Sequence, residues 1–209
     1  GEQHVPGRAL CDGAGVVESV GEGVPRSRVG ERVWIYQAQH GRRFGTAAEY
    51  LAIDTRRAAP LPEPAGFEVG ACLGIPVMTA HRCVFADGPV EGQSLLVKGG
   101  AGRVGYYAIQ WAKSAGARVI ATASRPDDER TCREVGADAI VNHREPGWGE
   151  RVKAANGGAP VDRVVEVEFG ANLAEVLQCI RTGGTIATYS SMQAPEPKLP
   201  FYRMMFMDL

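Results

Sequence analysis

The sequence lacks the features that mark several common protein classes. No run of about 18 apolar residues occurs, so the chain predicts no membrane-spanning helix. Positive and negative side chains nearly cancel, with a formal net charge of −1, which gives no electrostatic reason to expect binding to nucleic acid or to an anionic membrane. The first residues do not show the basic and then apolar pattern of a signal peptide, and we therefore expect a cytoplasmic location.

Cysteine is scarce and scattered. Five cysteines occur, and no two of them have the C-x-x-C spacing that is typical of zinc sites. Their odd number also argues against a framework of disulfides. We expect free thiols that are buried or half-buried at Cys11, Cys72, Cys83, Cys132 and Cys179.

Apolar residues and glycine are abundant and ordered. Hydrophobic residues make up 44% of the 209 residues and charged residues 22%, which is typical of a globular protein of one large or two small domains. The 27 glycines follow no fixed period, which excludes collagen-like and low-complexity structures. Many of them stand at the ends of apolar stretches, where the chain has to turn tightly.

The first part of the chain is rich in short β-like stretches. Three such stretches, separated by glycines, occupy residues 15–20, 31–36 and 48–53. Their spacing predicts small antiparallel strands in a barrel-like arrangement. Prolines between residues 60 and 64 mark a connection, and a helical pattern then runs from Phe67 to Phe85 with a break at residues 74–76.

Apolar strands and amphipathic helices alternate along the second part. We predict strands at residues 94–98, 118–122, 139–141, 161–167 and 185–189, and helices at residues 104–115, 127–135 and 172–180. Because such alternation buries both faces of a parallel sheet, it predicts an α/β fold with a doubly wound parallel sheet of the Rossmann type. We expect a β-rich domain at residues 1–75 and this sheet domain at residues 76–209, without the last strand of the six-stranded form.

The strongest motif is a glycine-rich turn between the strand at residues 94–98 and the helix that follows it. It contains G-x-G-x-x-G at Gly100, Gly102 and Gly105. We expect Gly100 to permit the tight turn, Gly102 to let a pyrophosphate approach the backbone, and Gly105 to let the helix pack against the strand. The N-terminus of that helix would then offer N–H groups to the phosphates.

The end of the next strand indicates which dinucleotide is bound. A site selective for NAD usually carries Asp or Glu there, about 20 residues past the turn, to bind the ribose hydroxyl. This sequence has Ser124 and Arg125 instead, and Arg130 follows near the start of the next helix. A hydroxyl and a guanidinium suit the 2′-phosphate of NADP, so the residues predict NADPH rather than NADH.

With these motifs, the chain resembles the medium-chain dehydrogenase/reductase superfamily, and within it the zinc-free quinone oxidoreductases of the zeta-crystallin group. The resemblance runs through residues 12–21, 29–34, 45–50, 74–80, 99–105, 136–138 and 141–144. It implies that the β-rich domain is part of a GroES-like catalytic domain and that the second domain binds NADP.

The resemblance also implies roles for individual residues. Thr79 corresponds to a threonine that approaches the nicotinamide half of the cofactor, and Tyr189 to a residue packed near the nicotinamide. The stretch from Ala101 to Val104, with Gly102 and Arg103, corresponds to the pyrophosphate loop. Ser124, Arg130 and His143 fall where the family contacts the 2′-phosphate.

The sequence departs from the zinc-dependent alcohol dehydrogenases of the superfamily. Their Gly-His-Glu is absent from residues 6–12, and so are their four closely spaced cysteines. We therefore expect no metal site. The N-terminal strands of the family, its final strand and its C-terminal helices have no counterpart here, so the chain is similar to the central part of a larger enzyme.

These features predict an oxidoreductase that transfers hydride from NADPH to a small-molecule quinone or α,β-unsaturated carbonyl, without zinc. The cofactor would lie across the carboxyl ends of the strands, with the nicotinamide between the two domains. Tyr36, Gln39 and His40 are candidates for the edge of the substrate cleft. Two alternatives stay open, an enoyl reductase acting on thioester-bound chains and a non-catalytic NADP-binding protein. The apolar stretch at residues 199–207 and the family together favour a homodimer.

Overall fold

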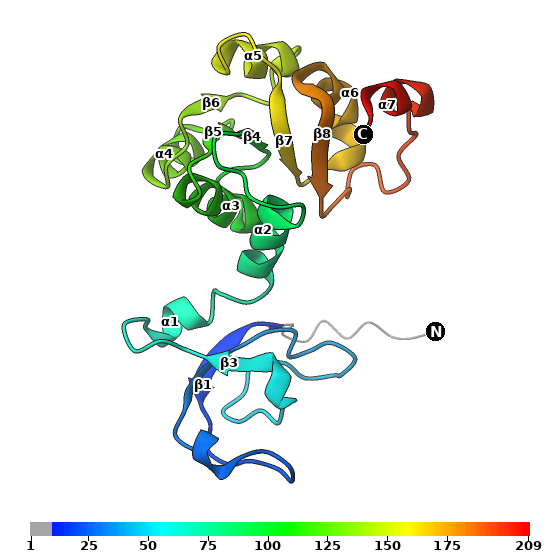
Figure 1. Cartoon of the computed structure of the whole chain (residues 1–209). Coiled ribbons are helices and arrows are strands. Elements are labelled where there is room, and N and C mark those ends of the chain that lie inside the picture. The colour runs from blue at the N-terminus through cyan, green and yellow to red at the C-terminus, as the bar shows by residue number, and fades with distance from the viewer. Residues whose placement is uncertain (1–9) are drawn as a thin grey trace. The chain divides into compact units, whose positions relative to one another are not determined.

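The computed structural model describes residues 10–209, which form two compact units with a boundary after Met78 (Figure 1). The first unit holds a three-stranded sheet, and the second a five-stranded sheet with helices between the strands. The predicted fold class, an α/β protein with a doubly wound parallel sheet and a smaller β-rich part, is therefore confirmed.

Three short antiparallel strands form the sheet of the first unit. They are β1 (Gly13–Val16), β2 (Arg32–Ile35) and β3 (Ala58–Pro60), in the order β1-β2-β3. The 3-10 helices η1 (Arg26–Arg28) and η2 (Thr55–Arg57) and the one-turn helix α1 (Phe67–Gly70) lie in the connections and after β3. On the central strand β2, the apolar side chain of Val33 is buried.

The strand predicted at residues 48–53 is wrong. This segment has no regular secondary structure, and it joins no strand ladder within the described residues. Its alternating pattern predicted a half-buried strand, but Tyr50 is 73% exposed. A strand needs a neighbour to satisfy its N–H and C=O groups, and periodicity in the sequence does not supply that neighbour.

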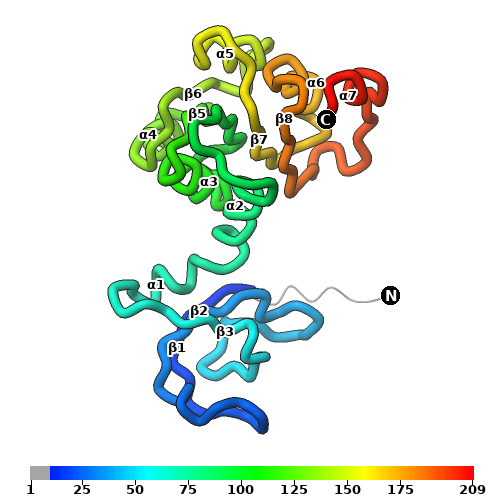
Figure 2. Tube along the Cα trace, in the orientation of Figure 1, coloured from blue at the N-terminus to red at the C-terminus, as the bar shows by residue number. Residues whose placement is uncertain are grey.

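Five parallel strands form the sheet of the second unit (Figure 2). They are β4 (Ser94–Val97), β5 (Arg118–Thr122), β6 (Ala139–Val141), β7 (Val161–Glu166) and β8 (Ile180–Thr188). The order is β6-β5-β4-β7-β8, so the chain reverses its direction of winding between β4 and β7. Ligands of open α/β sheets bind at the carboxyl ends of the strands beside such a reversal.

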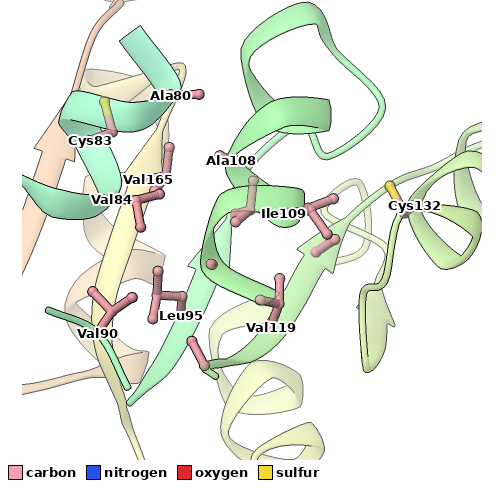
Figure 3. Close-up of a cluster of buried hydrophobic side chains, with 14 of the residues drawn as sticks. Ala80, Cys83, Val84, Val90, Leu95, Ala108, Ile109, Val119, Cys132 and Val165 are labelled. Atoms are coloured by element: carbon pink, nitrogen blue, oxygen red, sulfur yellow. The ribbon is translucent and has the colours of Figure 1, made fainter. Parts of the chain in front are cut away.

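Helices cover both faces of this sheet. They are α2 (Ile75–Phe85), α3 (Arg103–Ser114), α4 (Pro126–Glu134), α5 (Trp148–Ala155) and α6 (Phe169–Cys179), with α7 (Phe201–Met207) after β8. Residues of α2, α3 and α4, including Val84 and Ile109, bury one face together with Leu95 and Val165 (Figure 3). Residues of α5 and α6 bury the other face. Within the described part of the chain, no helix is long and apolar enough to cross a bilayer.

Several predicted elements differ in extent from the structure. Helix α5 was not predicted, because only Trp148, Gly149 and Val152 of its residues are buried and the apolar pattern is weak. Helix α6 begins three residues earlier than predicted, at Phe169, and β8 begins at Ile180 instead of residue 185. Gly170 in α6 and Gly183 and Gly184 in β8 favour turns by their intrinsic propensity. Tertiary contacts override that preference here.

The thiols mostly follow the expectation. Cys83, Cys132 and Cys179 are buried and Cys11 is half-buried. Cys72 is the exception, because it lies exposed in the turn between α1 and α2. All five are free, so no disulfide contributes to either unit.

Candidate functional site

The glycine-rich turn joins β4 to α3 at the carboxyl edge of the parallel sheet. The Gly99 N–H donates to Thr122 Oγ1 at 2.9 Å, and the Gly100 N–H donates to the Thr122 backbone oxygen at 3.0 Å. A third bond runs from the Gly102 N–H to the Gly99 oxygen at 2.9 Å. Contacts within the protein therefore fix the shape of the turn.

The tight turn is made by Gly99, not by Gly100 as predicted. Gly99 has a φ of +64°, in the left-handed region that favours glycine, whereas Gly100 does not have a positive φ. Gly100 is needed for space instead, because a Cβ there would lie 2.7 Å from Cys132 Sγ and 2.9 Å from the Ala121 Cβ. Its lack of a side chain lets the turn pack on α4 and β5.

The other two motif glycines bring the turn close to the start of α3. A Cβ on Gly102 would lie 3.0 Å from the Gly99 oxygen. A Cβ on Gly105 would collide with the same oxygen and lie 2.9 Å from the Gly100 Cα. Gly105 therefore has the close-packing role that the sequence predicted for it.

The N-terminus of α3 has the chemistry of an anion site. Helix α3 starts at Arg103, and its N-cap, Gly102, has no side chain that could accept from the first N–H groups. Ala101 and Val104 are half-buried on either side, while Gly102 and Arg103 are exposed. Free N–H groups and the positive end of the helix dipole suit a phosphate or pyrophosphate.

Ser124 and Arg125 lie at the carboxyl end of β5, beside this turn. Ser124 is half-buried, and Arg125 is the exposed N-cap of α4. The Arg125 guanidinium donates twice to Asp128, from Nε at 2.8 Å and from Nη2 at 3.0 Å. This bidentate pair raises the pKa of Arg125 and lowers that of Asp128. Asp128 had not been singled out in the sequence.

Arg130 is held differently. It lies within α4, where its guanidinium contacts Asp127 at 2.9 Å and Glu134 at 3.9 Å. The three side chains are exposed, with 66% for Arg130, 82% for Asp127 and 67% for Glu134. Among the described contacts, none joins Arg130 to Ser124 or Arg125.

His143 lies in the loop after β6, and its ring is half-buried. Its Nδ1 atom is buried and has no hydrogen-bond partner among the described residues. Burial lowers the pKa of His143, and the positive charges of Lys98 and Arg144 lower it further. The imidazole is therefore neutral at neutral pH and can accept a hydrogen bond.

Lys98 is a charged residue of the site that the sequence analysis missed. It follows β4 directly, its side chain is only 1% exposed, and its Nζ lies 3.4 Å from the centroid of the Trp148 ring. On the neighbouring strand, Glu166 is also fully buried. Burial lowers the pKa of Lys98 to about 8. A lysine that ends an otherwise apolar strand was the available signal.

The residues predicted near the nicotinamide lie on two elements. Thr79 is half-buried on α2, and Tyr189 follows β8. The Tyr189 N–H donates to the Glu166 backbone oxygen at 3.1 Å, and burial raises the pKa of the Tyr189 hydroxyl. Both residues belong to the second unit, but no described contact joins them.

The three cleft candidates belong to the first unit. Tyr36 donates its hydroxyl to the Arg56 backbone oxygen at 2.8 Å, and Gln39 donates its side-chain amide to the Arg43 oxygen at 3.2 Å. His40 is exposed. None of the three lines the cavity of about 670 Å³ that the structure places over β1, β2 and the segment at residues 48–53.

The residues that the structure describes, 10–209, include no cluster of three or more His, Cys, Asp or Glu side chains that could hold a metal ion. Part of the segment on which the sequence argument against zinc rests, residues 6–9, lies outside the described residues.

Fold and site together define a class of protein. A doubly wound parallel sheet with a glycine turn at its winding reversal, leading into an uncapped helix N-terminus, is a dinucleotide-binding domain. The family profile described as "Zinc-binding dehydrogenase" matches residues 104–209, and the profile described as "Alcohol dehydrogenase GroES-like domain" matches residues 1–63. The chain belongs to the medium-chain dehydrogenase/reductase superfamily.

Individual relatives refine this placement. The quinone oxidoreductase of Rattus norvegicus is 35% identical over 184 residues, covering 88% of this chain and 54% of the relative, so the chain spans about half the length of the curated relatives it matches. A mycobacterial structure, Rv1454c complexed with NADPH, superposes with a TM-score of 0.81 at 30% identity, over 94% of this chain and 61% of that one. An NAD-dependent alcohol dehydrogenase superposes at 0.84 with 32% identity, over 95% and 65%.

Proposed function

We propose that the chain is the NADPH-binding part of a zinc-independent oxidoreductase that reduces a quinone or an α,β-unsaturated carbonyl. The observation that carries the proposal is the glycine turn at the winding reversal of the sheet, where Gly102 leaves the start of α3 uncapped and open to a phosphate. The 35% identity to a quinone oxidoreductase and the fold match to an NADPH-bound structure support this choice of acceptor and cofactor.

The residues divide the work of binding between two places on the carboxyl edge. The N–H groups at the start of α3 hold the pyrophosphate, and Gly102 keeps side-chain atoms out of its way. Ser124 and Arg125 bind the 2′-phosphate by hydrogen bonding and charge. Arg130 and the neutral ring of His143 are secondary contacts for the same group.

The chemistry that bound NADPH supplies is a hydride from its nicotinamide ring. The protein contributes position: Thr79 and Tyr189 are the side chains proposed to border the nicotinamide. Tyr36, Gln39 and His40 remain the proposed edge of the substrate site. Hydrogen bonds from the protein are proposed to polarise the acceptor.

The test is turnover by the full chain. NADPH oxidation would be followed at 340 nm with a soluble quinone, with an enone, and with an enoyl thioester as separate acceptors. Turnover with the quinone or the enone is expected. Turnover with the thioester alone would favour the enoyl reductase alternative, and NADPH binding without turnover of any acceptor would favour the non-catalytic one.

We also propose that the chain forms a homodimer in a cytoplasmic setting. Within the described residues, β8 has a strand neighbour on one side only, and the segment after it exposes Met192, Phe201, Tyr202 and Phe206. Apolar side chains at a sheet edge favour association with a second copy. Sedimentation velocity would give twice the mass of 22.3 kDa for a dimer and contradict the proposal if the monomer persists at high concentration.

A further inference from the structure

The ion pair between Arg125 and Asp128 occupies the position proposed for the 2′-phosphate. Arg125 caps the N-terminus of α4, and Asp128 lies in the first turn of the same helix. Both oxygens of Asp128 accept from the guanidinium, at 2.8 and 3.0 Å. The pair therefore uses the two-donor fork with which an arginine would otherwise bind a phosphate.

The Asp128 carboxylate also interacts electrostatically with a second arginine, Arg144. Its pKa is lowered first by the hydrogen bonds from Arg125, and then by the positive charges of Arg125 and Arg144. Its side chain is 25% exposed, against 71% for Arg125. The carboxylate is thus the less solvated partner, and it neutralises the groups that would attract a second anion.

The neighbouring carboxylates, Asp127 and Glu129, form no described ion pair with Arg125. Asp127 contacts Arg130 in a pair whose members are 82% and 66% exposed, so water can replace either partner at little cost. Glu129 has no described ion pair. Only Asp128, among the three acidic residues in the first turn of α4, holds Arg125.

We propose that Asp128 is a selectivity residue that competes with the 2′-phosphate for Arg125 and so weakens NADPH binding relative to NADH. The inference rests on the proposed function, because it requires the 2′-phosphate to bind at Arg125. A phosphate that reaches Arg125 must displace the carboxylate or share the guanidinium with it, and the two anions repel each other. A cofactor with a free 2′-hydroxyl meets neither cost.

The experiment measures the adenosine half alone. Dissociation constants for 2′,5′-ADP and for 5′-AMP would be determined by calorimetry on the full chain, in the unsubstituted protein and in Asp128→Asn. We expect Asp128→Asn to bind 2′,5′-ADP about five- to ten-fold more tightly. Binding of 5′-AMP should change less than about two-fold, since a surface group that does not touch the ligand has little effect.

Two further variants separate the ion pair from charge alone. Glu129→Gln removes the same charge one residue further along the helix, and it should leave the affinity for 2′,5′-ADP within about two-fold. In an Arg125→Ala background, Asp128→Asn should no longer increase the affinity for 2′,5′-ADP. No guanidinium is then left for which the carboxylate and the 2′-phosphate could compete. Persistence of the full gain in that background would overturn the proposal.

The remaining outcomes are equally decisive. Unchanged affinity of Asp128→Asn for 2′,5′-ADP overturns the inference while leaving the proposed function intact. Equal weakening of 5′-AMP and 2′,5′-ADP also overturns it, because Asp128 would then bind the ribose itself. If no variant binds either nucleotide, the proposed function fails together with the inference.

Discussion

The Nζ atom of Lys98, the residue that follows β4, lies 3.4 Å from the centroid of the Trp148 ring at the start of α5. The ammonium group is buried, with the side chain 1% exposed, and it has no hydrogen-bond partner in the described part of the chain. The ring face offers electrostatic compensation for a cation. Burial nevertheless dominates and lowers the pKa of Lys98 to about 8.

This burial gives stability a pH dependence that can be assigned to one residue. Below the folded pKa of about 8, the folded state carries a buried charge that the unfolded state solvates, and this penalty disappears as the pH rises toward 10.5, the ordinary lysine value. Lys98→Met removes it. We expect the variant to exceed the parent in unfolding free energy by about 3 kcal/mol more at pH 7 than at pH 10.5.

Urea unfolding of both proteins between pH 7 and 10.5 checks this expectation. Ionisation of Cys132 and of Tyr189, neither of which is affected by the Lys98 charge, is the same in both proteins and cancels in the difference. The Lys98 charge does lower the pKa of Cys179, but that pKa, about 12, lies above the pH range of the experiment. Lys113→Met is the control, because Lys113 is partly exposed and paired with Asp138 at 2.9 Å. A parent–variant difference that stays constant with pH would contradict the assignment.

Gly102 and Gly105 should respond in different ways when each is replaced by alanine. Gly105→Ala places a Cβ against the backbone of Gly99 and Gly100, so we expect a loss of about 2 kcal/mol or more in unfolding free energy. Gly102→Ala meets one atom, the Gly99 oxygen, at 3.0 Å, and should cost less than about 1 kcal/mol.

For NADPH binding we expect the opposite order, with Gly102→Ala the more damaging substitution relative to its effect on stability. Gly102→Ala puts a methyl group where the phosphates approach α3, and a loss of about ten-fold or more in NADPH affinity is expected from a nearly intact fold. Thermal melts and NADPH fluorescence titrations on the same preparations measure both effects. Unimpaired binding by Gly102→Ala would place the phosphates elsewhere.

The sequence predicted the parallel sheet because each strand and helix in it carries its own periodicity. The strand at residues 94–98, the helix from Val104 and the stop at Gly116 are local patterns, and the structure contains all three. The segment at residues 48–53 failed for the opposite reason, since pairing with another segment decides whether an apolar alternation becomes a strand.

The site was predictable only as far as its motif extends. The spacing of Gly100, Gly102 and Gly105 located the phosphate turn, but the backbone angle that makes the turn belongs to Gly99. The pairing of Arg125 with Asp128 could not be inferred, because a charged residue three positions along a helix is common and usually solvated. The contact between Lys98 and Trp148 joins segments 50 residues apart in sequence by tertiary packing alone.

Arg163 links β7 to α2, and its hydrogen bonds should stabilise the second unit against unfolding. Its Nη1 donates to the Cys83 oxygen at 3.0 Å and its Nη2 to Asp87 at 2.8 Å, with the arginine side chain 5% exposed. We expect Arg163→Ala to lower the unfolding free energy by about 3 kcal/mol, and Arg163→Met, which keeps the apolar volume, to lower it by less. Denaturant unfolding compares the two, and equal losses would indicate that the hydrogen bonds, not the volume, account for the effect.

We propose that this chain holds NADPH with its 2′-phosphate at Arg125. The most direct test is a fluorescence titration of NADPH and of NADH on the full chain and on Arg125→Ala. We expect NADPH binding to weaken about ten-fold in the variant, while NADH affinity stays within about two-fold. NADPH binding that is unaffected by the loss of Arg125 would contradict it.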